Sequence, residues 1–321
     1  MAPNLLFGCS SFGDSRIPTA EVVQPFLDAW KNLGHTRLDT AYIYPSMDAF
    51  TVSEKLLGEV DAAKQGFIID TKVKSFVPGS HKYDDVIQSG LEQLERLKVD
   101  KINILYLHAP DHTVPFEETH KAINELYNKG VFKEFGLSNY KIEEVQLFLD
   151  NAKTNGWIKP TVYQGVYNLI ARHAEDDLFA LLEKNDMAFY GYSPLAGGFF
   201  SNFKRDSKPE ANGRFDPSTV IGQIFGGFYG KASLWDASDM LAELAQSLGL
   251  ESNEVALRWL YYSSPLAKNP ANGIIIGGSK VEHLKTNLAY IKEGPLTDNA
   301  VAAIDKIWEV AKDDALSYCS F

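Results

Sequence analysis

The sequence is poor in cysteine. Its 321 residues include two cysteines, Cys9 and Cys319, which lie near opposite ends of the chain. This number and spacing suit neither a disulfide-stabilised small fold nor a set of metal ligands, so we expect no metal site. A reducing compartment is the natural setting for such a protein, and we predict a cytoplasmic location.

Long apolar segments and runs of positive charge are also missing. No window approaches the roughly 20 apolar residues of a membrane-spanning helix, and the N-terminus has no basic region of a secretion signal. The net charge is −11, from 31 lysines and arginines against 42 aspartates and glutamates. Nucleic acids and anionic membranes would repel such a surface, so we expect neither as a partner, although a local basic pocket for a phosphate stays compatible with it.

What the sequence does contain is a regular alternation of apolar runs and amphipathic segments. Strands are predicted at 5–9, 36–38, 67–71, 102–107, 133–137, 160–164, 188–193 and 273–277, and their apolar character suits a parallel sheet buried on both faces. Helices are predicted at 19–34, 52–57, 84–97, 116–128, 142–152, 174–185, 238–248, 252–262, 281–290 and 298–310. Eight strand–helix units predict a (β/α)8 TIM barrel that spans residues 1–321 as a single domain, with the last helix packed outside it.

One stretch, from about 194 to 235, interrupts this rhythm. It is rich in glycine, proline, asparagine and aspartate and has weak periodicity. We therefore predict a long loop after the seventh strand. Loops of that length in a compact domain are usually lids, binding loops or disordered segments.

Ionisable side chains stand at the ends of three consecutive predicted strands. Asp39 follows the second strand and Tyr44 lies five residues later, Lys72 ends the third strand, and His108 ends the fourth. Because the carboxyl ends of parallel strands meet on one face, we expect these four groups to converge there. The type of each residue then predicts its role in a proton-transfer site.

A cation beside Tyr44 would lower the phenol pKa toward neutrality, and Lys72 is the predicted cation. Asp39 would balance and orient Lys72, and His108 would donate a hydrogen bond to a substrate carbonyl oxygen. The site therefore predicts an acid that serves carbonyl reduction. No side chain supplies a hydride, so a hydride-carrying cofactor is implied.

Each of these residues alone also has an ordinary interpretation. Asp39 suits a turn or helix cap, and Lys72 a solvated strand end. His108 suits a packed histidine and Tyr44 a partly buried ring. Their shared position on one barrel face favours the site. Lys72 as the Schiff-base lysine of a barrel aldolase is a further, weaker interpretation.

Seven motifs in order, LDTAYIY, IDTKV, YLHAPDH, FGLSNY, VYQGVYN, YGYSPLAGG and IIIGGSKVEHLKTNL, cover nearly the whole chain and resemble the aldo-keto reductases. The runs LHAPDH, WIKPTVYQG, PLAGG and EGPL most resemble the aflatoxin-aldehyde and succinic-semialdehyde reductase branch. The resemblance implies a barrel without a Rossmann domain, a small carbonyl substrate and NADPH extended across the carboxyl face. It also implies a catalytic tetrad of Asp39, Tyr44, Lys72 and His108, with Tyr44 as general acid, and suggests a homodimer.

The resemblance also assigns residues to the cofactor. Ser138, Asn139 and Gln164 would hold the nicotinamide carboxamide, and Tyr192 would stack on the ring. The pyrophosphate would be wrapped by Ser193, Pro194, Leu195, Ala196, Gly197 and Gly198. Without the resemblance, Ser138 and Asn139 suit a helix N-cap, Gln164 a polar strand end, and Tyr192 the core.

The other end of the cofactor has its own predicted residues. Gly278, Ser279 and Lys280 precede a helix, whose N-terminus suits a phosphate, and Lys280 adds a cation for a 2′-phosphate. The resemblance brings Arg214 to the phosphates and Asn287 to the adenine, and it aligns His283 with a glutamine of the branch. Solvated side chains are the alternative for Lys280 and Arg214. Because no acidic residue stands out as a partner for a ribose 2′-hydroxyl, we favour NADP over NAD.

Two segments depart from the branch. Residues 45–50 make a longer loop after Tyr44, and 199–203 replace Leu-Leu-Thr-Gly with a phenylalanine-rich sequence that we expect to give a more aromatic pocket. Both bear on the substrate. The prediction is an NADPH-dependent reductase of aldehydes or activated ketones. A dedicated biosynthetic reductase of narrow range and a non-catalytic NADPH-binding regulatory subunit are the alternatives, and we find no docking extension that would favour the latter.

Overall fold

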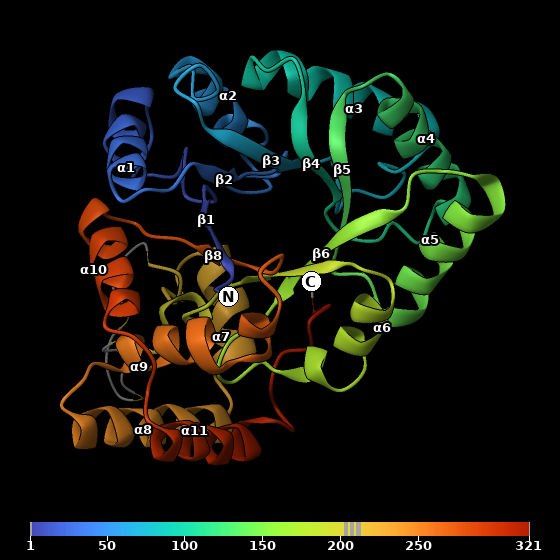
Figure 1. The fold of residues 1–321 in the computed structure, drawn as a ribbon. Helices are drawn as coiled ribbons and strands as arrows, with labels where there is room; N and C mark the ends of the chain where they lie inside the picture. The colour runs from blue at the N-terminus through green and yellow to red at the C-terminus, as the bar shows by residue number, and fades with distance from the viewer. Residues whose placement is uncertain (1, 202–204, 206–208, 210–212, 321) are drawn as a thin grey trace.

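A closed barrel of eight parallel strands forms the centre of the computed structural model, which describes residues 2–201, 205, 209 and 213–320 (Figure 1). The strands follow one another around the barrel in chain order, and β8 closes it against β1. They are β1 Asn4–Gly8, β2 Arg37–Asp39, β3 Ile68–Lys72, β4 Ile102–Leu107, β5 Phe132–Ser138, β6 Pro160–Val166, β7 Ala188–Tyr192 and β8 Gly273–Ile276. The predicted (β/α)8 fold is confirmed.

Strand β4 shows why these segments are apolar throughout. Leu105 and Leu107 belong to the large core between the strands and the surrounding helices, whereas Ile104 and Tyr106 pack with Leu6 and other residues of the barrel interior. Alternate residues of a strand point to opposite faces, and here both faces are buried. An uninterrupted apolar run is therefore what this position requires.

The helices that follow the strands cover the outside of the barrel (Figure 1). In α4, Glu117 and Glu118 occupy the first turn, where carboxylates interact favourably with the helix dipole. The surrounding helices are α1 Ala20–Asn32, α2 Val52–Glu59, α3 Tyr83–Leu97, α4 Phe116–Asn128, α5 Ile142–Asn155, α6 Leu178–Lys184, α9 Ser252–Arg258 and α10 Val281–Lys292.

Three further helices are additions to the barrel. Helices α7 Val220–Tyr229 and α8 Ala232–Leu248 lie between β7 and α9, and α11 Asp298–Ala311 follows α10. Helices α8 and α11 pack side by side away from the strands, at the bottom of Figure 1. The expected position of the last helix outside the barrel is thus confirmed.

Three predicted elements need correction. The stretch 194–235 is not a continuous loop, because it contains α7 and the first turn of α8. Residues 174–185 are not one helix: a 3-10 turn, His173–Glu175, precedes α6, and Asp177 between them has a non-helical backbone. The helix predicted to end at 262 changes after Arg258 into a short π-helical segment, Trp259–Ser263.

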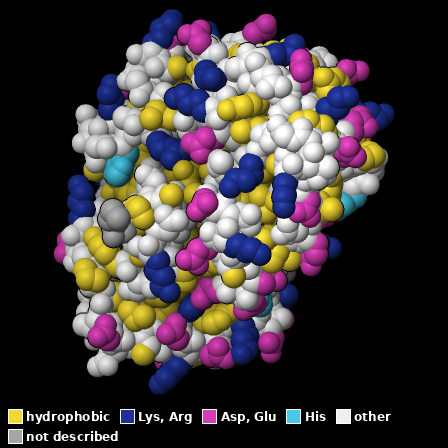
Figure 2. Space-filling view, turned by 45° about the vertical axis from the view of Figure 1, so that its right-hand side comes forward, with side chains coloured by type: hydrophobic (Ala, Val, Ile, Leu, Met, Phe, Trp, Pro, Cys, Tyr) yellow, Lys and Arg dark blue, Asp and Glu magenta, His cyan; other side chains and the backbone are white. Residues whose placement is uncertain are grey.

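Charged side chains of both signs lie on the surface. On the face shown in Figure 2, basic and acidic side chains are interspersed, with small hydrophobic areas between them. Within the described part of the chain, every helix is too short or too polar to cross a membrane.

Candidate active site

The four predicted catalytic residues lie together at the carboxyl ends of β2, β3 and β4. Lys72 Nζ donates hydrogen bonds to Asp39 Oδ1 at 2.9 Å, to Asp39 Oδ2 at 2.8 Å and to the Thr40 carbonyl oxygen at 2.8 Å. The side chain of Lys72 is 0% exposed and that of Asp39 is 2% exposed. The buried ammonium therefore has a counter-charge and hydrogen-bond acceptors, which is what a buried lysine needs to stay charged.

Tyr44 and His108 flank this ion pair. The centre of the Tyr44 ring is 5.0 Å from Lys72 Nζ and 5.7 Å from the centre of the His108 ring, which it meets edge-on. The loop that carries Tyr44 is held by α2, because the backbone N–H of Ser53 donates to the Tyr44 carbonyl oxygen at 3.3 Å. The Asp–Lys pair, the phenol and the imidazole thus form one compact group.

Burial controls the charge states of this group. Burial raises the pKa of Tyr44 and the Lys72 ammonium lowers it, and the net result is a pKa above the usual tyrosine value. The expected lowering by Lys72 is present but is outweighed by burial, which corrects the sequence prediction. Burial lowers the pKa of Lys72, but Asp39 more than compensates, so the pKa is raised. Lys72 is thus charged and the phenol of Tyr44 protonated at neutral pH.

His108 is neutral. Burial lowers its pKa well below the usual value, and the charge of Lys72 lowers it further. A neutral imidazole has one ring nitrogen that donates and one that accepts. It can therefore donate a hydrogen bond to a carbonyl oxygen beside the protonated Tyr44.

The residues assigned to the nicotinamide carboxamide lie next to the tetrad. Gln164 Nε2 donates to Asp39 Oδ1 at 2.9 Å, and Asn139 Nδ2 donates to the His108 carbonyl oxygen at 2.9 Å and to Ser138 Oγ at 3.1 Å. Tyr192 Oη donates to Asn139 Oδ1 at 2.8 Å. These side chains form two hydrogen-bonded groups: Gln164 with Asp39, and Asn139 with Ser138, Tyr192 and the end of β4.

The loop after β7 has several left-handed backbone positions. Ser193, Ala196, Gly197 and Gly198 all have positive φ angles. A side chain at Gly197 would collide with the ring of Phe225 in α7, whereas the nearest atom to one at Gly198 is Ser201 Oγ, 4.0 Å away. The space beside Gly198 is therefore open to a ligand, whereas the space beside Gly197 is filled by the Phe225 ring of α7. Pro194 and Leu195 lie within this turn, between Ser193 and Ala196.

The predicted phosphate residues divide into two places. Gly278 and Ser279 precede α10, and Lys280 is its exposed N-cap residue; Ser279 Oγ lies 3.4 Å from His283 Nδ1. Asn287 is buried in the same helix. Arg214 instead donates to Ser10 Oγ at 3.2 Å, in the turn after β1, with its guanidinium 5.5 Å from the centre of the Phe225 ring.

These groups fit a dinucleotide cofactor with a phosphate at one end. The 12-residue helix α10 begins beside a hydroxyl and an exposed ammonium, which is the donor set that binds phosphate. At the other end, buried amide groups of Gln164 and Asn139 lie next to the tetrad.

The two segments that depart from the branch have different surroundings. Phe199 and Phe200 are buried, and Phe199 packs on Tyr229 and Trp235 with ring centres 5.2 and 4.6 Å apart. Phe199 therefore packs against both α7 and α8, and Phe200 packs beside it. Asn202 and Phe203 lie outside the described residues, and the more aromatic pocket stays a prediction. In the loop after Tyr44, Phe50 contacts Tyr42 and Met47 is exposed.

Sequence reasoning missed several residues around the site. Phe76, after β3, places its ring edge-on to His108, with 5.1 Å between ring centres. Arg37 and Asp70 form a second ion pair in the barrel. Arg37 precedes Asp39 by two residues, and Asp70 precedes Lys72 by two residues. Because side chains two residues apart point to the same face of a strand, the sequence could have placed Arg37 and Asp70 on the same face as Asp39 and Lys72.

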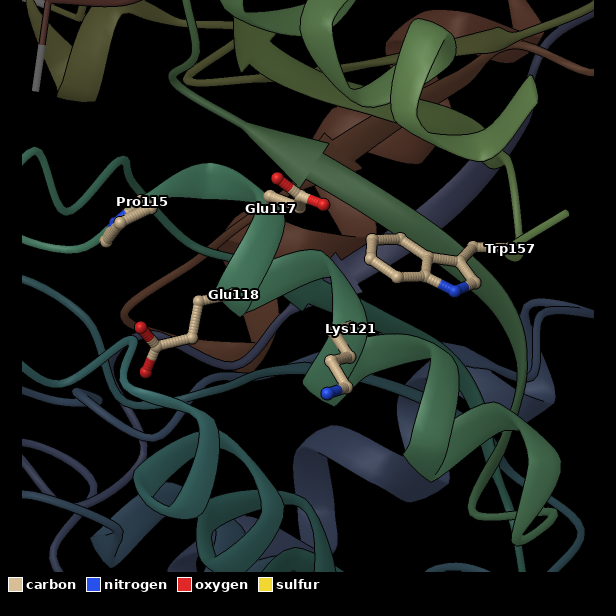
Figure 3. Close-up of a pocket in the computed structure, with 5 residues that line it drawn as sticks. All are labelled: Pro115, Glu117, Glu118, Lys121 and Trp157. Atoms are coloured by element: carbon tan, nitrogen blue, oxygen red, sulfur yellow. The ribbon is translucent and has the colours of Figure 1, made fainter. Parts of the chain in front are cut away.

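A separate groove lies on the outside of the barrel. It has a volume of about 440 Å³ and runs along α4, lined by Pro115, Glu117, Glu118, Lys121 and Trp157 (Figure 3). Glu118 Oε1 accepts a hydrogen bond from the backbone N–H of Tyr83 at 3.0 Å. This carboxylate of the groove therefore binds the first residue of α3. None of the predicted site residues lines this groove.

Comparison with known proteins agrees with this geometry. The aldo/keto reductase family model matches residues 4–309. The oxidoreductase sirO of Leptosphaeria maculans is 35% identical over 326 aligned residues, covering 99% of this chain and 97% of that protein. The aflatoxin B1 aldehyde reductase member 4 of Homo sapiens is 34% identical, covering 94% and 91%. An aldo-keto reductase of Pseudocercospora fijiensis is 34% identical, covering 91% and 99%. The chain belongs to the aldo/keto reductase family and is an oxidoreductase that acts on carbonyl compounds.

Proposed function

We propose that this protein reduces an aldehyde or an activated ketone to the alcohol with NADPH, and that Tyr44 is the general acid. The observation that carries the proposal is the fully buried Lys72–Asp39 ion pair beside a protonated Tyr44 and a neutral His108. Members of the family act on small carbonyl compounds, and one relative is named an aldehyde reductase. An aldehyde is therefore the first substrate class to test.

The roles of the four side chains follow from their charges. His108 donates a hydrogen bond to the carbonyl oxygen and so holds it near the Tyr44 hydroxyl. Bound NADPH supplies the hydride that the carbonyl carbon gains. As negative charge grows on the oxygen, Tyr44 gives it a proton, and Lys72 stabilises the phenolate that remains. Asp39 keeps Lys72 in place, and water returns the proton to Tyr44.

The cofactor would lie along the carboxyl ends of the strands. Ser138, Asn139 and Gln164 are proposed to bind its carboxamide, with Tyr192 against the nicotinamide ring. The turn at 193–198 is proposed to bind the pyrophosphate through backbone N–H groups. Ser279 and Lys280 at the start of α10, with Arg214, would bind the phosphates and favour NADPH over NADH.

The substrate range depends on the residues around Tyr44 and His108. The loop at 45–50 and Phe76 lie on that side of the site, and the ring of Phe76 already contacts His108. A broad aldehyde reductase and a biosynthetic reductase of narrow range would share the tetrad and differ here. A panel of carbonyl compounds separates these two possibilities.

The test is NADPH oxidation with small, aromatic and dicarbonyl substrates, with NADH in parallel. Tyr44→Phe should lower turnover by about 10²- to 10⁴-fold while NADPH still binds, because it removes only the proton donor. Tyr42→Phe is the matched control, since Tyr42 lies in the same loop and its ring contacts Phe50 and Arg96. Equal turnover by wild type and Tyr44→Phe would refute the assigned role of Tyr44.

A further inference from the structure

A second buried ion pair lies one layer deeper in the barrel than the Lys72–Asp39 pair. Arg37 Nη2 donates to Asp70 Oδ2 at 2.8 Å, and Arg37 Nη1 donates to Tyr190 Oη at 2.7 Å. Asn103 Nδ2 donates to Asp70 Oδ1 at 2.7 Å. Asp70 is fully buried, whereas Arg37 is 20% exposed. Both oxygens of the carboxylate are therefore bonded inside the barrel.

The strand register stacks this pair beneath the catalytic one. Arg37 precedes Asp39 by two residues on β2, and Asp70 precedes Lys72 by two residues on β3. Asp39 and Asp70 are direct neighbours across the two strands. Side chains two residues apart on a strand point to the same side, so both pairs face the barrel interior.

Asp39, Lys72, Arg37 and Asp70 are called the stack below, and their surroundings are mostly apolar. Leu6, Ile104, Val162 and Ile275 pack together inside the barrel with the rings of tyrosines 106 and 190. Charges in such a medium interact strongly over distances at which water would screen them. A change of charge at Asp70 or Arg37 should therefore be felt at Asp39 and Lys72.

The four charges of the stack balance one another. Two carboxylates, Asp39 and Asp70, face two cations, Arg37 and Lys72. The pKa of Asp70 is raised to about 6: burial is the largest cause and the charge of Asp39 adds to it, while Arg37 and the hydrogen bond from Asn103 lower it. Asp70 is therefore ionised above about pH 6, and the stack is then neutral.

Among the described residues, the following polar groups face the two titrating side chains. Asp70 is faced by Arg37 and Asp39 from β2, by Asn103 and Tyr106 from β4, and by Tyr190 from β7. Tyr44 is faced by the side chains of Lys72, Asp39, His108, Arg214 and Tyr192.

We propose that Arg37 and Asp70 are a positioning pair for the reaction: they balance the charge beneath Asp39 and Lys72, and so set how tightly Tyr44 holds the proton it donates. The proposal rests on the proposed role of Tyr44 as general acid. Neither residue reaches the reacting atoms, because both lie one layer below the strand ends. Their effect passes through the Lys72–Asp39 pair.

The test compares single and double charge removals. Asp70→Asn keeps the shape of the side chain and leaves the positive charge of Arg37 unbalanced, which favours the Tyr44 phenolate. The pH above which carbonyl reduction falls should therefore move down by about half to one unit. Arg37→Gln leaves the negative charge of Asp70 unbalanced, which disfavours the Tyr44 phenolate, so this pH limit should move upward. The shift should be smaller than that of Asp70→Asn, because loss of the cation raises the pKa of Asp70 and so lowers its ionised fraction.

The double variant Arg37→Gln/Asp70→Asn removes both charges and should return the alkaline limit to within about 0.2 units of wild type. A role in folding alone would not give shifts of opposite sign that cancel in the double variant. If Asp70→Asn fails to fold, Arg37→Gln and the double variant still test the sign and the cancellation. An unmoved limit in folded single variants, or a shift that persists in the double variant, would overturn the proposal.

A second readout does not depend on turnover. The tyrosinate absorbance of each variant is titrated with and without Tyr44→Phe, and the difference gives the pKa of Tyr44 in the cofactor-free protein. This pKa should shift in the same directions as the alkaline limit of the reaction. If no carbonyl compound were reduced, the titration would still decide whether the pair acts on Tyr44.

Discussion

The catalytic end and the phosphate end of the candidate site are built in opposite ways. At the catalytic end, Lys72 and Asp39 are buried and bonded to each other, and Gln164 binds the same carboxylate. At the start of α10, Lys280 is exposed, and Ser279 Oγ lies a long 3.4 Å from His283 Nδ1. The fold itself fixes the first group, whereas the second group is free to bind a ligand.

Breaking the buried pair should have the largest effect. Lys72→Met leaves the Asp39 carboxylate buried without a cation, so we expect a loss of about 3–5 kcal/mol in the free energy of unfolding. Carbonyl reduction should fall by about 10²- to 10⁴-fold, because the Tyr44 phenolate loses its stabilising charge. Urea unfolding and NADPH oxidation measure the two effects.

A double variant separates stability from catalysis. Asp39→Asn/Lys72→Met removes both charges, so it should regain part of the lost stability and none of the activity. If Lys72→Met had the same urea midpoint of unfolding as wild type, the buried pair would not contribute to the stability of the fold. The catalytic end would then resemble the phosphate end in this respect.

Breaking the phosphate end should change binding and leave stability alone. Lys280→Ala should weaken NADPH binding by about tenfold or more, because a charge-assisted bond to phosphate is lost, and should leave NADH binding unchanged. Fluorescence titration with the two cofactors measures this difference. Lys285→Ala is the matched control, since Lys285 is exposed on the same helix. Equal losses for NADPH and NADH would show that Lys280 does not contact the 2′-phosphate.

The smallest expected effect belongs to His283. The branch that the chain resembles carries glutamine at this position, and His283→Gln replaces one exposed polar side chain by another beside Ser279. We expect NADPH affinity to change by less than about threefold and the urea midpoint to stay constant. A larger loss of affinity in the same titration would mean that the imidazole itself contacts the cofactor.

The sequence predicted the regular part of the barrel well, for physical reasons that particular elements show. Strand Ile102–Leu107 and helix Phe116–Asn128 were predicted with their observed bounds, because an apolar run and an amphipathic stripe are local signals. Helix α7 was not predicted. It contains no charged residue and four glycines in or next to it, and it is stabilised by distant contacts of Phe225 with Gly197 and of Tyr229 with Phe199.

The convergence of the tetrad could also be predicted, since parallel strands bring their carboxyl ends to one face. The bonds within the site could not. Gln164 and Asp39 are 125 residues apart, and Tyr192 and Asn139 are 53 apart, so no local pattern indicates that they meet. The pKa of Tyr44 was misjudged because the extent of burial, which outweighs Lys72, is a property of the folded barrel.

The bond between Gln164 and Asp39 has a mechanical consequence. Asp39 belongs to β2, Lys72 to β3 and Gln164 to β6. One carboxylate therefore links strands on different sides of the open end of the barrel. The carboxylate that bonds to Lys72 therefore also holds strands together across the open end of the barrel. A mutation that adapts this site to new chemistry would therefore also loosen the frame that holds it, which narrows the routes by which such an enzyme can evolve.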